Sequence, residues 1–174
     1  QNRVRTLDLR LLSGNTAVHS DMLIWSKEET PEVVALQILN VIFSTPQISC
    51  MLTELPSSHL RMLAFWMSFC MRHRKTLLES KLRPEHPEHS YPVVTAESAE
   101  ETITALYETD RVIRLNASHR HIVLNATHAP ELLIETPHPR KCIVFNTFGE
   151  EVLRCEVSGL ARVAVPASGF AEFE

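Results

Sequence analysis

The stretch AVHSDMLIWSKEETPEVVALQILNVIFSTPQISCML, Ala17 to Leu52, decides the fold of the first half of the chain. Short apolar runs stand at its two ends, Ala17–Trp25 and Pro46–Leu52, and predict buried strands. Between them Pro31–Phe43 predicts a helix, with proline in the first turn, where its missing N–H is not needed. A strand, a helix and a second strand in this order predict a parallel sheet built from βα units.

Helices are also predicted on either side of this stretch. Asn2–Gly14 carries apolar residues at helical spacing and ends at a glycine. Pro56 opens a long helical run that reaches Ser80, and its segment Met62–Met71 is apolar nearly all round. A membrane-spanning helix needs about 20 apolar residues. This shorter segment therefore predicts a buried helix, and no membrane partner is expected.

The second half of the chain changes character after a proline-rich connector at Lys81–Val94. Short runs rich in Val, Ile and Leu follow at a spacing of roughly ten residues, with polar turns between them, which is typical of an antiparallel sandwich. These runs lie at residues 102–108, 111–116, 121–127, 131–136, 141–147, 150–157 and 161–166. The predicted fold class is therefore α/β plus all-β. Residues 1–84 form the last βα units of a (β/α)8 barrel, and residues 85–174 form an antiparallel β-sandwich domain.

Composition excludes several classes of partner. A formal net charge of -4 over 174 residues argues against nucleic-acid binding, which usually needs a basic face. The four cysteines lie far apart without a CxxC pair, which indicates free, mostly buried thiols and favours a reducing, cytoplasmic compartment. The chain begins without Met or a signal-peptide pattern, and we expect it to be a fragment of a longer protein.

Two groups of residues suggest chemistry at first sight. His19, Ser20 and Asp21 are adjacent, but neighbouring strand residues point to opposite faces, whereas a catalytic triad is assembled from distant positions. His119 and His121 could share one face of a strand and bind a metal, as in a metal-dependent β-rich enzyme. No third ligand has convincing spacing, so we expect solvated loop histidines there and no metal or cofactor.

Five segments together resemble a known family. They are VHSDMLIWS (18–26), VIFSTPQIS (41–49), HLRMLAFWMSFCMRHRKTLL (59–78), YPVVTAE (91–97) and IVLNAT (122–127). In order and composition they resemble the carboxyl-terminal portion of family 36-type α-galactosidases, the melibiase clan of glycoside hydrolases. The resemblance spans essentially the whole chain and implies a retaining hydrolase of terminal α-galactosyl linkages.

The resemblance also implies where the catalytic carboxylates lie. In the family, one Asp after barrel strand four is the nucleophile and another after strand six is the acid/base. Between Asp21 and the connector there is room for one helix, one strand and one final helix. Ala17–Trp25 then becomes strand seven and Pro46–Leu52 strand eight. Both catalytic residues are expected upstream of Gln1, and the fragment itself is expected to be inactive.

On this interpretation His19, Asp21 and Trp25 lie near the carboxyl end of strand seven, where active sites of such barrels collect. They are the candidate residues for binding an α-galactoside or related oligosaccharide. The alternative is that His19 and Asp21 hydrogen-bond barrel loops while Trp25 packs beneath the rim. With six strands absent, we also expect open strand edges and self-association of the amino-terminal half, whereas the sandwich should fold independently.

A second hypothesis is that the chain is a non-catalytic module whose β-sandwich binds carbohydrate or a partner chain. A sugar-binding face usually presents a row of aromatic side chains. The aromatics of the sandwich region, Tyr107, Phe145 and Phe148 among them, are few, which argues against such a row.

Overall fold

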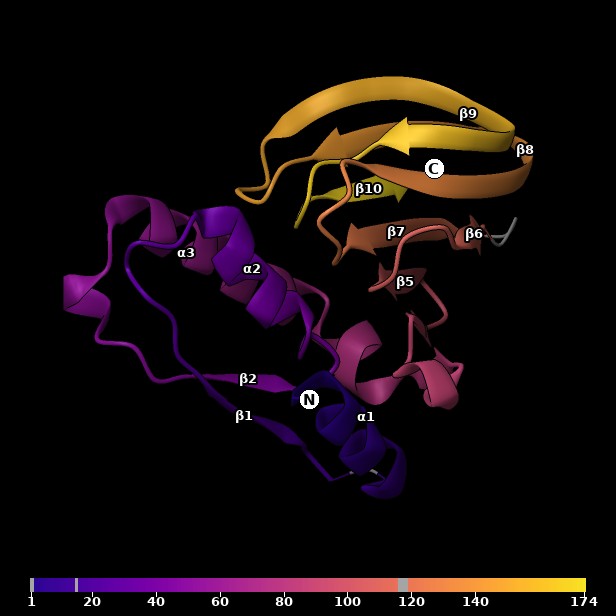
Figure 1. Ribbon diagram of the computed structural model, residues 1–174. Coiled ribbons are helices and arrows are strands. Elements are labelled where there is room, and N and C mark those ends of the chain that lie inside the picture. The colour runs from indigo at the N-terminus through magenta and orange to yellow at the C-terminus, as the bar shows by residue number, and fades with distance from the viewer. Residues whose placement is uncertain (1, 15, 116–118) are drawn as a thin grey trace.

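Two sheets of very different size organise the computed structural model, which describes residues 2–14, 16–115 and 119–174. Helices α1 (Asn2–Leu12), α2 (Pro31–Leu39) and α3 (Ser57–Arg72) accompany a small sheet of two strands, β1 (His19–Leu23) and β2 (Thr45–Ile48). Figure 1 shows these elements gathered on one side of a larger sheet that curls over itself. No helix within the described ranges is long and apolar enough to cross a membrane.

The small sheet has the predicted connectivity. β1 and β2 run parallel, and α2 lies between them in the chain. Thr30 caps α2 by accepting a hydrogen bond from the Val33 backbone N–H, and Pro31 occupies the first turn. Both strands are shorter than predicted, because β1 begins only at His19 and β2 ends at Ile48. The next residues instead enter a short 3₁₀ turn, Leu52–Glu54.

Helix α3 is the buried helix that the sequence predicts. It begins directly after Pro56, and Met62, Trp66 and Phe69 on one face are almost completely buried. The helix ends at Arg72, earlier than predicted, and a π-helical turn at Lys75–Glu79 leads into the large sheet. The spacing of these buried residues by three and four positions is the pattern of a helix packed on one side.

The large sheet contains eight strands. They are β3 (Lys81–Glu85), β4 (Val93–Glu97), β5 (Glu101–Leu106), β6 (Val112–Arg114), β7 (Arg120–Asn125), β8 (Glu131–Phe145), β9 (Glu151–Ala164) and β10 (Phe170–Phe173). Their order is β3-β4-β5-β7-β10-β8-β6, with β9 paired to β8. β5 pairs with β7 in parallel and β6 pairs with β8 in parallel. The prediction of a purely antiparallel sandwich is therefore wrong, and the sheet is mixed.

Strand β8 makes the sheet curl. Its first part pairs with β6 and its last part, Cys142–Phe145, pairs with β10. Between them the register with β9 shifts at Thr136–Arg140, where Pro137 and Pro139 lack the N–H groups that a ladder needs. The sequence predicts two separate strands here, but the structure has one long bent strand. Figure 1 shows β8 and β9 arching over the rest of the sheet.

The curled sheet buries a core on each of its faces. The inner face encloses residues such as Val123, Val144 and Phe173, whereas the outer face packs against the helices. The core between helices and sheet joins side chains from both halves of the chain, including Trp66 and Phe170, whose ring centroids are 6.0 Å apart. The predicted boundary between residues 84 and 85 falls inside β3, so the two halves are joined at a packed interface.

Candidate functional site

The three residues predicted to bind substrate do not converge at one end of β1. His19 is the first residue of β1 and lies at its amino-terminal end, so its predicted place near the carboxyl end is wrong. The reason is that Ala17 and Val18 precede the strand. Asp21, in the middle of the strand, accepts a hydrogen bond of 2.6 Å from Arg5 of α1, and both side chains are more than half exposed.

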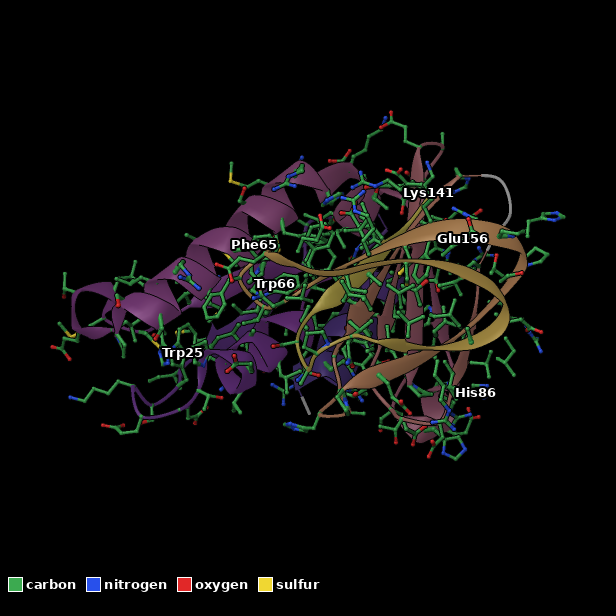
Figure 2. The ribbon with its side chains drawn as sticks, turned by 90° about the horizontal axis from the view of Figure 1, so that it is seen from above. Trp25, Phe65, Trp66, His86, Lys141 and Glu156 are labelled. Carbon is green, nitrogen blue, oxygen red and sulfur yellow. The ribbon has the colours of Figure 1, made fainter. Side chains whose placement is uncertain are left out.

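Trp25 follows the carboxyl end of β1 and turns inward. Its side chain is buried, and its indole N–H has no hydrogen-bond partner. Figure 2 shows Trp25 among the helical elements, apart from the curled sheet. Met22 and Ile24, which alternate with Leu23 and Trp25, are each 70% exposed. One face of β1 is therefore packed on the helices while the other is uncovered.

A hollow lies at the opposite end of the small sheet. Val18 and Thr45, next to the amino-terminal ends of the two strands, line a cavity of about 440 Å³ together with Arg10, Arg74 and Glu79. Active sites of (β/α)8 barrels collect at the carboxyl ends of the strands. This cavity lies at the amino-terminal ends of the two strands, which is the end opposite to the one where such barrels bind their substrates.

The curled sheet contains a second polar cavity, which the sequence did not predict. Its volume is about 380 Å³, within the range of roughly 300–1,000 Å³ that small-molecule sites occupy. The cavity opens between β6 on one side and the strands from β3 to β7 on the other. Thr95, Thr102, Thr104 and His121 are among the residues that line it.

These side chains form a hydrogen-bonded chain across three strands. The hydroxyl oxygens of Thr95 and Thr104 are 3.0 Å apart, and Thr104 Oγ1 is 2.8 Å from His121 Nε2. In the neighbouring pair Thr102 Oγ1 is 2.9 Å from His119 Nε2. Thr102 and Thr104 project from the same face of β5 because alternate strand residues share a face. Part of the cavity wall therefore consists of hydrogen-bonded threonine side chains.

His121 is a neutral member of this wall. Burial, helped by the positive charge of Arg140 and by His119, lowers the pKa of His121 to about 4. Its Nδ1 is buried without a hydrogen-bond partner. An unpaired acceptor near Arg140 is less unfavourable than an unpaired donor, so the proton belongs on Nε2, which donates to Thr104. The prediction of a solvated loop histidine is wrong for His121, which is buried in β7.

Charged groups at the margin of the cavity are largely paired. Arg83 of β3 forms an ion pair with Glu97, and Arg114 of β6 forms one with Glu135 at 2.6 Å. Because both lining arginines are already paired with carboxylates, the cavity offers hydrogen-bonding threonine side chains rather than a free cation for an anionic ligand. Among the described residues, no cluster of three or more His, Cys, Asp or Glu side chains could hold a metal.

A buried polar network joins the helical part to the large sheet. His73 Nδ1 at the end of α3 is 2.8 Å from Glu101 Oε1, and Thr76 donates to the same oxygen at 2.9 Å. Arg120 is 3.9 Å from the other carboxylate oxygen of Glu101 and donates to Glu172 at 2.6 Å. Each acidic side chain of this network has a basic partner, so we interpret the network as a structural contact between the helical part and the large sheet rather than as a reactive site.

Comparison with protein-family models and with curated proteins found no match to the chain.

Proposed function

We propose that the chain is the carboxyl-terminal portion of a retaining glycoside hydrolase that resembles the α-galactosidases. In this proposal β1 and β2 are strands seven and eight of a (β/α)8 barrel, and the curled sheet is the β domain that follows the barrel. The longer protein would hydrolyse terminal α-galactosyl linkages with two carboxylates that precede Gln1.

The incomplete environment of the small sheet is the observation that supports this proposal most. Parallel sheets in proteins are normally covered on both faces, yet Met22 and Ile24 expose most of their side-chain surface. Within the described residues the sheet has only two strands, each with one unpaired edge. Additional parallel strands beside β1 or β2, and side chains from them over Met22 and Ile24, would supply the missing cover.

In the proposed barrel, β1 contributes wall rather than chemistry. Asp21 is held by Arg5, and this ion pair fixes the direction of an exposed carboxylate. Trp25 has a buried indole N–H that still lacks an acceptor, which a neighbouring barrel loop or a sugar hydroxyl could supply. His19 is the first residue of β1, and Trp25 lies beyond the other end of the strand. Since an extended chain rises by about 3.3 Å per residue, the two side chains are too far apart to share a pocket.

Enzyme assays on the chain and on its longer parent test the proposal. The chain alone should not hydrolyse a nitrophenyl α-galactoside, whereas a parent with an Asp at the end of each upstream catalytic strand should. In the parent, Asp21→Ala should lower kcat/KM about tenfold, because it disturbs positioning and leaves the nucleophile in place. Glu156→Ala, on an exposed part of β9, is the matched control. Turnover by the chain alone that Asp21→Asn abolishes would contradict the strand assignment.

A second candidate function is favoured by the polar cavity inside the curled sheet. Its hydroxyl-lined wall and paired charges suit a neutral polyol such as a monosaccharide. Titration of the chain with galactose, followed by calorimetry, tests this role. Thr95→Val should abolish any heat of binding, and Thr53→Val, an exposed residue of the helical half, should leave it unchanged. Equal binding by both variants would exclude this cavity as the site.

A further inference from the structure

Two of the four free cysteines face each other across the β8–β9 hairpin. In the antiparallel register Cys142 lies opposite Cys155, between the pairs Lys141–Glu156 and Ile143–Arg154. Figure 2 labels Lys141 and Glu156, the pair next to them, on the two neighbouring strands. Sequence separation hides this pairing, because the two cysteines meet only when the hairpin forms.

We propose that Cys142 and Cys155 are a redox-active dithiol that a small-molecule disulfide oxidises to a cross-strand disulfide. Directly opposed residues of antiparallel strands have Cα atoms about 4.5 or 5.5 Å apart, and disulfides join Cα atoms about 4.4–6.8 Å apart. The Cys155 side chain is also close enough to Cys142 to raise the pKa of the Cys142 thiol. The bond can therefore form without movement of the backbone from its native register.

The surroundings of the two thiols set the order in which they react. Cys142 is fully buried in the inner core, whereas Cys155 is only partly buried. Burial, together with the adjacent Cys155, raises the pKa of Cys142, so its thiolate is scarce near neutral pH. Cys155 is thus the thiol that meets an external oxidant, and Cys142 is the resolving thiol.

Oxidation by glutathione disulfide proceeds in two exchange steps. The Cys155 thiolate attacks one sulfur of glutathione disulfide, forms a mixed disulfide and releases one glutathione thiolate. Cys142 then loses its proton to solvent, and its thiolate attacks Cys155 Sγ and releases the second glutathione thiolate. The protein loses two protons and two electrons, and one glutathione disulfide becomes two glutathione molecules.

The disulfide would act on the most exposed strand of the sheet. Within the described residues β9 pairs with β8 alone, and its first four residues are exposed. A covalent link from Cys155 to Cys142 closes the loop that contains the β8–β9 turn. Closing such a loop removes conformational freedom from the unfolded chain and prevents β9 from fraying. Oxidation should therefore stabilise this edge and leave the fold unchanged.

Incubation of the native full chain with glutathione disulfide, followed by mass spectrometry of unreduced peptides, tests the proposal. We expect the loss of two hydrogen atoms, a peptide linking Cys142 to Cys155, and a rise in Tm of about 5–10 °C that reduction reverses. A persistent glutathione adduct on Cys155, a link to Cys50 or Cys70, or four unmodified thiols under conditions in which the unfolded chain is oxidised would each overturn it.

Single substitutions separate the two roles. Cys142→Ser should trap the glutathione adduct on Cys155, and Cys155→Ser should leave Cys142 as a thiol. Cys70→Ser, in α3, is the matched control and should form the disulfide as the unaltered chain does. Circular dichroism checks that each variant folds, and Cys142→Ala replaces Cys142→Ser if the hydroxyl disturbs the core. The peptide map of the unaltered chain shows by itself whether Cys142 and Cys155 are linked, so the test does not require that the variants fold.

Discussion

The two sheets of this chain differ in how completely the molecule covers them. In β7 of the curled sheet, Val123 points to the inner core and Leu124 to the helix-facing core, and neither is exposed. In the small sheet, Leu23 at the end of β1 is 4% exposed, and Ile24, directly after the strand, is 70% exposed. Both pairs consist of adjacent apolar residues, so residue type does not explain the difference in exposure. The difference lies in the number of layers around each strand.

This difference shows which sheet the described residues cover on both faces. The curled sheet supplies its own second layer by bending β8, and helices supply the third. The small sheet has helices on one side and nothing on the other within the described residues. A parallel sheet of two strands is rarely stable by itself, because parallel pairing relies on burial of both faces. In this molecule the packed interface with the curled sheet helps to hold the helical part in place.

The largest expected effect comes from breaking that interface. Trp66 of α3 is fully buried, contacts the Phe170 ring edge-on, and donates through Nε1 to Thr147 Oγ1 at 3.4 Å. Trp66→Ala should lower the free energy of unfolding by about 3–5 kcal/mol, since it leaves a large cavity. Urea unfolding followed by far-UV circular dichroism measures this loss.

The same experiment tests whether the two parts fold together. The sequence predicts that the β domain folds independently, whereas the shared core predicts one cooperative transition in which helix and sheet signals change together. Trp66→Phe is the matched control and should lose less stability. If Trp66→Ala melts the helices while the curled sheet stays intact, the interface is weaker than its packing suggests.

Acidification should weaken the curled sheet through His121. The unfolded chain binds a proton at this histidine near pH 6.5, whereas burial keeps the folded form neutral down to about pH 4. The unfolded state thus binds more protons between these values, and stability falls as the pH falls. The loss should reach roughly 3 kcal/mol by pH 4. His121→Gln should flatten the pH dependence of unfolding, and exposed His128→Gln should leave it unchanged. Equal curves for all three proteins would contradict a buried neutral His121.

A smaller effect is expected from the polar network between the two parts. Burial opposes ionisation of Glu101, but His73, Thr76 and Arg120 outweigh it and hold the pKa of Glu101 below its usual value. Glu101→Gln should cost about 2 kcal/mol, because His73 loses a charged acceptor in a buried site. Exposed Glu100→Gln is the matched control.

The pH dependence gives this network a second test. A carboxylate with a lowered folded pKa contributes stability above its unfolded pKa and loses it as the pH falls through the folded value. The difference in unfolding free energy between the unaltered chain and Glu101→Gln should therefore be largest near neutral pH and shrink in acid. A difference that stays constant down to pH 2 would show that the charge of Glu101 does not contribute.

Sequence periodicity predicted the elements that depend on local pattern. The helices near Asn2, Pro31 and Pro56, the order of the first two strands and their parallel pairing all follow from apolar spacing and from proline and glycine positions. Periodicity could not predict that Glu131–Phe145 is one strand, since Pro137 and Pro139 look like a turn. The bend is tolerated because β9 continues to pair on both sides of it.

The candidate sites depend even more on strand pairing in the large sheet, which periodicity does not predict. The polar cavity brings Thr95, Thr104 and His121 together from three strands, and their contact depends on the parallel pairing of β5 and β7. An antiparallel prediction places these residues elsewhere. Cys142 and Cys155 likewise meet through the register of β8 and β9. Cys142 lies seven residues before Gly149 and Cys155 six residues after it, and this near-symmetry about the predicted turn was a signal in the sequence that could have suggested the pair.

The smallest effect on stability, and the most direct test of the comparison between the sheets, is expected from the uncovered face of β1. Met22→Thr with Ile24→Thr should change the free energy of unfolding by no more than about 0.5 kcal/mol, because both side chains are exposed in the chain as it stands. Threonine is β-branched, a shape that strands favour.

The same double variant tests whether the uncovered face binds a second copy of the chain. If it does, sedimentation across a concentration series should show association by the unaltered chain and a shift toward monomer in the double variant. Leu160→Thr removes a similarly exposed side chain from β9 and should not alter the association. If Leu160→Thr reduces association as much as the double variant does, or if the double variant leaves association unchanged, the small sheet is not the surface through which copies associate. Its uncovered face then remains exposed to solvent.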